Sequence, residues 1–81
     1  MSEDQRPLTF GERACGVSFN PGGSMEVAVI KQLYAGLVDA LHKRREETTD
    51  NEVKRMLSVA ITETQTAQMW AVKAVTWNKL S

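Results

Sequence analysis

The residues best suited to binding a charged ligand surround a turn at positions 20–24, which reads Asn-Pro-Gly-Gly-Ser. Proline followed by glycine is a strong turn signal, and Ser24 is a good N-cap for a helix that begins there. Such a turn offers free backbone N–H groups and the positive end of the helix dipole to an anion, and Lys31 follows about two turns inside the helix. The same pattern is more often a plain helix N-terminus, and no Gly-Lys-Ser/Thr follows as in a Walker loop. Phosphate binding and simple capping therefore both stay open at this point.

Two aromatic residues, Phe10 and Phe19, lie before the turn in a segment that has no core of its own. Aromatic side chains on a loop near cationic groups can stack on nucleobases. The simpler interpretation, which composition alone favours, is that the rings pin the N-terminal segment onto the rest of the protein.

Residue types that usually perform catalysis are sparse. His42 and Cys15 are each the single residue of their type, and His42 lies in a charged run, so a Cys–His pair is not expected. Residues 47–50 have the Glu-x-x-Asp form of helical Mg²⁺-dependent nucleotide pyrophosphatases, which need a second acidic pair on an adjacent helix. Because that second pair is lacking, this motif is expected only to mark where one helix ends and the next is capped. The sequence therefore predicts no catalytic set, no metal site and no cofactor.

Length and charge limit the classes of protein that the chain can represent. Its 81 residues predict one domain, residues 1–81, in which the polar residues 1–8 are expected to be disordered. Ten basic residues balance ten acidic ones, whereas a non-specific binder of DNA or RNA usually carries a strong basic excess. No apolar run is long enough to span a membrane, and the acidic N-terminus differs from a signal peptide. We expect a soluble, cytoplasmic protein whose anionic ligand, if any, is small.

The hydrophobic pattern predicts an all-α fold, in which a short N-terminal helix lies with an antiparallel hairpin of two long helices, residues 24–47 and 50–79. A Thr-x-x-Glu capping box at Thr9 predicts the short helix, through about Cys15, and residues 17–19 are expected to be extended. A second capping box, at Thr49, is expected to start the second long helix. Threonines in the middle of that helix, at 62, 64 and 66, either contact a polar ligand or, as we favour, hydrogen-bond to their own helix.

Both long helices carry apolar residues on more than one side. In the first, residues spaced by three and four form a stripe of Val27, Ile30, Tyr34, Leu37 and Leu41. In the second, a stripe of mostly small residues is flanked by a larger set, Met56, Val59, Met69, Val72 and Val75. Two helices cannot bury two faces each against one another, and one cysteine cannot form an internal disulfide. Because so small a scaffold needs an additional source of stability, the pattern predicts a homo-oligomer.

Three motifs together resemble the phage anti-CBASS cyclic-nucleotide sponges over roughly residues 9–78. They are Gly-Val-Ser-Phe-Asn-Pro-Gly-Gly at 16–23, Glu-Val-x-x-Ile-Lys at 26–31, and a closing block at 61–77 that contains Thr-Ala-Gln-Met-Trp-Ala-Val-Lys-Ala-Val-Thr-Trp. The resemblance implies a short helix laid across a helical hairpin, assembled as a homohexamer. It implies that the protein sequesters cyclic dinucleotides between subunits, and in some members cyclic trinucleotides, without cleaving them. The expected location is the cytoplasm of the infected bacterial host.

The resemblance also implies site residues. An aromatic residue near the N-terminal lid stacks on a base in this family, which Phe19 or Phe10 would do, and a lysine early in the long helix contacts phosphate, which Lys31 fits. Asn20 would be a polar contact beside Phe19. For a trinucleotide site, Arg13 and the threonine-rich stretch are candidates. The alternatives to a sponge are a structural or regulatory oligomer that binds only protein partners, and a nucleotide-cleaving enzyme.

Overall fold

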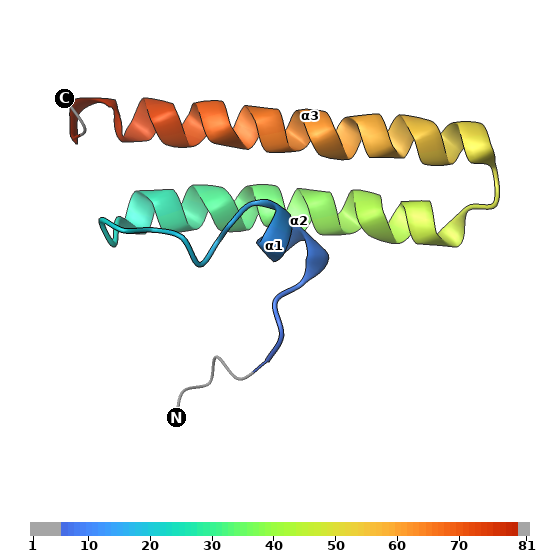
Figure 1. The fold of residues 1–81 in the computed structure, drawn as a ribbon, viewed down its shortest axis with the longest axis horizontal. Coiled ribbons are helices and arrows are strands. Elements are labelled where there is room, and N and C mark those ends of the chain that lie inside the picture. The colour runs from blue at the N-terminus through green and yellow to red at the C-terminus, as the bar shows by residue number, and fades with distance from the viewer. Residues whose placement is uncertain (1–5, 80–81) are drawn as a thin grey trace.

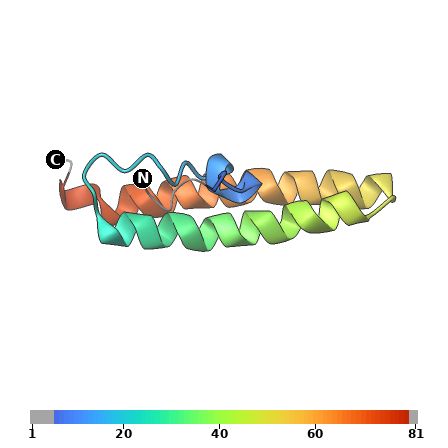
Figure 2. The same cartoon turned by 90° about the horizontal axis from the view of Figure 1, so that it is seen from below.

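Two long antiparallel helices and one short helix build the protein, as a computed structural model of residues 6–79 shows (Figure 1). The short helix α1 comprises Phe10–Ala14, and the hairpin consists of α2, Met25–Glu47, and α3, Asn51–Val75. A 3-10 turn, Trp77–Lys79, follows α3. Helix α1 and the loop that leads from it into α2, residues 15–24, lie on the same face of the hairpin (Figure 2). The predicted all-α hairpin with a short N-terminal helix is confirmed for the described residues.

Local side-chain hydrogen bonds begin each helix. Thr9 and Glu12 form the predicted capping box, in which Thr9 Oγ1 accepts from Glu12 N at 3.0 Å and Glu12 accepts from Thr9 N at 2.9 Å. Ser24 caps α2, and its Oγ accepts from Val27 N at 3.2 Å. The expected cap of α3 at Thr49 is wrong, because the Asp50 carboxylate takes this position and accepts from two backbone N–H groups.

Two further boundaries differ from the sequence prediction. Helix α3 ends at Val75, where it was expected to continue to Lys79, and the 3-10 turn takes up the last residues. Residues 17 and 18 lie in a turn that ends α1, where an extended segment was expected. Gly16 adopts a φ of 62°, and Val17 N donates to Glu12 O at 3.1 Å. This is a Schellman motif, which only a residue tolerant of the left-handed conformation can close easily.

The core is small and lies where α1 crosses the hairpin. Its buried apolar side chains come from α2, α3 and the C-cap of α1, and they are Cys15, Ala35, Val38 and Ile61. Helix α2 buries the row Val27, Lys31, Ala35 and Val38. This row is rotated from the predicted stripe, because Leu37 is 49% exposed. Two of the three threonines hydrogen-bond to their own helix as favoured, since Thr64 Oγ1 donates to Ala60 O and Thr66 Oγ1 donates to Thr62 O.

Many large apolar side chains remain exposed on the single chain. On α2 they are spaced by four residues as Met25, Val29, Leu33 and Leu37. On α3 and the following turn they are Met56, Val59, Met69, Trp70 and Trp77. Spacing by four places the α2 set along one side of the helix. Exposed apolar side chains grouped in this way often mark interaction sites, and they are consistent with the predicted self-association.

Candidate functional site

A pocket of about 420 Å³ is lined by residues from the start of α2 and the end of α3, and so it opens at the end of the hairpin opposite the α2–α3 connection. It lies where the α1–α2 loop, the start of α2 and the end of α3 come together. The lining residues are Phe19, Asn20, Pro21, Gly22, Ser24, Val27, Lys31, Val72 and Thr76. Its size is within the range of about 300–1,000 Å³ typical of small-molecule sites, and its walls are mostly apolar with a few polar groups, as such sites usually are. We call it the end pocket.

Lys31 contributes a buried positive charge beside the end pocket. Its side chain is 7% exposed, and Nζ donates to Gly16 O at 3.0 Å and to Phe19 O. Nζ also lies 5.5 Å from the centre of the Phe19 ring. A buried ammonium group is tolerated only when it is well hydrogen-bonded, and the two loop carbonyls satisfy that condition. Phe19 and Lys31, which the sequence analysis singled out as possible parts of one site, are therefore in direct contact.

Phe19 presents its ring to the outside, whereas Asn20 holds the turn together. The Phe19 residue is 72% exposed, so one face of the ring can meet a planar group. Asn20 Nδ2 donates to Ser24 O at 2.8 Å, and Asn20 Oδ1 accepts from Ser24 N at 3.2 Å. Gly23 adopts a φ of 63° and its N–H donates to Asn20 O at 2.9 Å. The amide of Asn20 therefore fixes the rim of the pocket, and a direct contact to ligand stays a prediction.

Phe10 lies in a different place, at the start of α1. Its ring stacks on His42, with centroids 4.1 Å apart and planes 9° apart. The guanidinium of Arg45 lies 5.6 Å from the Phe10 ring, 3.0 Å from His42 Nδ1 and 2.9 Å from Ser58 Oγ. Phe10 therefore pins α1 onto α2, as the simpler sequence interpretation held. Arg13 is exposed on α1 and does not line the end pocket, and ligand roles for Phe10 and Arg13 stay predictions.

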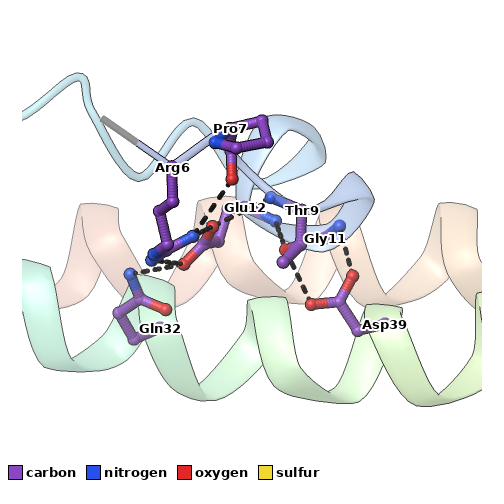
Figure 3. Close-up of polar contacts among 7 residues, drawn as sticks. All are labelled: Arg6, Pro7, Thr9, Gly11, Glu12, Gln32 and Asp39. Carbon is purple, nitrogen blue, oxygen red and sulfur yellow. Dashed lines mark hydrogen bonds and ion pairs between the residues drawn. The ribbon is translucent and has the colours of Figure 1, made fainter. Parts of the chain in front are cut away.

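A polar cluster locks α1 onto α2 and thereby positions the loop (Figure 3). The Asp39 carboxylate accepts from Gly11 N and from Thr9 Oγ1, both at 2.7 Å. Glu12 pairs with Arg6 through two contacts of 2.8 Å and accepts from Gln32 at 3.3 Å.

Arg6 belongs to the segment 1–8 that was expected to be disordered, and residues 1–5 of that segment lie outside the described part of the chain. The Arg6 hydrogen bonds, followed by the Thr9 N–H, lower the pKa of Glu12 from 4.5 to about 2.

The remaining candidate chemistry has structural explanations. Cys15 is buried in the core, and burial followed by the nearby Asp39 charge raises the pKa of its thiol, which makes it a poor nucleophile. Asp50 caps α3, and Glu47 is exposed as the last residue of α2. Within residues 6–79, no cluster of three or more His, Cys, Asp or Glu side chains is placed to hold a metal ion. Over the same residues, no helix has both the length and the apolar character required to cross a bilayer.

Two lining residues, Val72 and Thr76, were not predicted as part of the site. They lie four apart on α3 and so share one face of that helix. Only the antiparallel pairing of the hairpin brings them opposite the glycine turn, and spacing along one helix does not reveal which residues face the loop.

Fold and site together define a small antiparallel helical-hairpin domain in which the α1–α2 loop and both long helices shape a ligand-sized pocket at one end. No curated protein and no solved structure matches the chain. The sequence does match the family model of the Acb2/Tad1 hairpin domain over residues 14–76, which is most of its length, and the chain belongs to this family. The match confirms the resemblance to the anti-CBASS sponges noted from the sequence motifs.

Proposed function

We propose that the protein sequesters cyclic oligonucleotide messengers, primarily cyclic dinucleotides, without cleaving them. It would act as a phage protein in the cytoplasm of the infected bacterium and so block CBASS signalling. Membership of the Acb2/Tad1 family supports a cyclic-nucleotide ligand. The observation that carries the proposal is the end pocket, where the exposed ring of Phe19 lies next to the buried ammonium of Lys31.

A cyclic dinucleotide offers two planar bases and two phosphates, and the end pocket has a counterpart for each kind of group. The Phe19 face and the apolar walls suit a base, since stacking on an aromatic side chain is worth about 1–3 kcal/mol per base. Lys31 suits a phosphate, because hydrogen bonds between charged groups are stronger than neutral ones. With ten basic and ten acidic residues, the chain suits a small dianion better than a nucleic-acid polymer.

The proposal includes assembly as a homohexamer with ligands held between subunits. The exposed apolar stripe of α2 and the exposed tryptophans after the middle of α3 support self-association. Light scattering at micromolar concentration should show an assembly of several 9.0 kDa chains, and a folded monomer would contradict this part of the proposal.

Sequestration is tested by binding followed by recovery. The protein is titrated with a panel of cyclic di- and trinucleotides in a calorimeter, and each complex is then heated and the released ligand is analysed. We expect intact ligand. Linear or mononucleotide products that increase with protein concentration would indicate an enzyme, and a lack of binding across the panel would favour an oligomer that binds only proteins.

Phe19 provides the sharpest test of the site within this proposal. Phe19→Leu keeps an apolar side chain but removes the stacking face, and we expect at least tenfold weaker binding of a cyclic dinucleotide, in line with about 1–3 kcal/mol per stacked base. Phe19→Tyr keeps the face and serves as the matched control. Scattering on both variants checks assembly. Equal affinity of Phe19→Leu and the parent protein would place the ligand elsewhere.

A further inference from the structure

The Lys31 ammonium group connects the α1–α2 loop to the end pocket. It donates to the carbonyls of Gly16 and Phe19, which lie at two points of that loop, and its side chain also lines the pocket. An ammonium group has three N–H donors. The two carbonyls occupy two of them, which leaves one for an anionic group of a bound ligand.

The loop has firm anchors at its two ends and a different kind of support between them. The Schellman motif at Gly16 holds one end, and the hydrogen bonds between Asn20 and Ser24 hold the other. Between these anchors, Phe19 N donates to Gly16 O at 3.0 Å, and Lys31 Nζ donates to both Gly16 O and Phe19 O. The Phe19 ring is mostly exposed, so its packing does little to fix the backbone that carries it.

We propose that Lys31 is a positioning residue, which holds the α1–α2 loop so that the Phe19 ring is ready to stack on a ligand base. This inference rests on the proposed function and adds a role for Lys31 beyond contact with phosphate. The same ammonium group serves the loop and the ligand anion, so binding of the anion and ordering of Phe19 are coupled. A pre-ordered stacking face avoids part of the entropy cost of binding, and this is how the coupling would raise affinity.

The coupling makes a prediction about the protein without ligand, which a simple phosphate contact does not make. Lys31→Met keeps a long side chain but removes all three donors. In the ligand-free variant, amide hydrogen exchange at Phe19 should be at least tenfold faster, because the loop has lost both of its hydrogen bonds to Lys31 and opens more often. Exchange at Gly23, which donates to Asn20 O, should stay as in the parent protein. Lys54→Met, which replaces an exposed lysine of α3, is the matched control.

Affinity is measured in the same proteins with the cyclic dinucleotide that binds the parent most tightly. Lys31→Met should bind at least tenfold more weakly, and Lys54→Met should bind like the parent. Unchanged exchange at Phe19 in Lys31→Met would overturn the positioning role, even if affinity fell. Faster exchange with unchanged affinity would overturn the coupling. A parent that binds no cyclic nucleotide would refute the proposed function and the coupling to ligand, while the exchange data still decide whether Lys31 holds the loop.

A measurement on the unaltered protein covers the case in which Lys31→Met does not fold. Nitrogen-detected NMR should show slowly exchanging Nζ protons for Lys31, with couplings across the hydrogen bonds to the carbonyls of Gly16 and Phe19. Their signal should move when a cyclic dinucleotide is added. Rapidly exchanging Nζ protons with no such couplings would contradict the proposal.

Discussion

Replacing Gly11 by alanine should separate α1 from the hairpin, because α1 approaches α2 more closely at this residue than a side chain allows. A Cβ atom at position 11 would lie 2.9 Å from the Ala35 carbonyl carbon and closer still to its oxygen, and 2.9 Å from Asp39 Cγ. The Ala35 atoms belong to the backbone of a long helix, so they cannot move aside. Helix α1 must therefore shift outward.

The cost of that shift follows from the contacts that it breaks. Overpacking a tight interface typically costs about 1–3 kcal/mol. The shift also weakens the hydrogen bonds of Gly11 N and Thr9 Oγ1 to the Asp39 carboxylate, and bonds to a charged group are each worth about 1.5–3 kcal/mol. These terms overlap, and we expect Gly11→Ala to lower the free energy of unfolding by about 3 kcal/mol.

Gly36→Ala is the matched control. Gly36 lies within α2, and a Cβ there meets no atom within 4 Å. Replacing an exposed helical glycine by alanine stabilises a helix by about 0.5–1 kcal/mol. Urea unfolding followed by circular dichroism, at one fixed protein concentration, compares the two variants with the parent. If Gly11→Ala proves as stable as Gly36→Ala, α1 does not pack against Ala35 as described.

Two further outcomes follow from the titrating groups of α1 and its C-cap. The pKa of Glu12 lies near 2 in the folded protein and near 4.5 when unfolded, so its contribution to stability is complete above pH 4.5 and is lost as the pH falls toward 2. The urea concentration at the unfolding midpoint should therefore fall as the pH is lowered through this window, and it should fall less in Glu12→Gln. If Glu12→Gln and the parent protein show the same pH dependence, the Arg6–Glu12 pair does not act in solution. The thiol of Cys15 is buried and its pKa is raised, so it should react with an alkylating reagent far more slowly in buffer than in urea, and equal rates would contradict its place in the core.

The starts of α1 and α2 were predictable from local signals, whereas the equally local capping-box signal at Thr49 misplaced the cap of α3 by one residue. The capping box of Thr9 and Glu12 and the cap at Ser24 involve residues three apart in the chain, and the structure has both. The end of α3 was not predictable in the same way. Thr76 Oγ1 donates back to Val72 O at 2.7 Å as the helix stops, and neither glycine nor proline marks the site.

The buried face of α2 was misplaced because two of its residues do not look like core residues. Lys31 is charged and Ala35 is small, so the apolar pattern favoured a neighbouring row that includes Leu37. The α1–α2 loop covers Lys31, and Gly11 of α1 covers Ala35. Neither covering segment is close in sequence to the residue that it buries. Hydrophobic periodicity reports on the average surroundings of a helix and cannot identify a row that a short polar segment covers.

The location of the end pocket follows from this same covering segment. The sequence motifs placed Phe19, Asn20 and Lys31 together, and the structure brings them into one pocket, because the loop folds back over the helix that it precedes. That fold-back depends on α1, which is attached to α2 by the hydrogen bonds of Asp39, by the Gln32–Glu12 hydrogen bond and by the Phe10–His42 stack. A substitution that detaches α1 should therefore displace the Phe19 ring, even though the substituted residue does not itself line the pocket. In this chain, the stability of a short helix and the readiness of the proposed binding site are two consequences of one set of contacts.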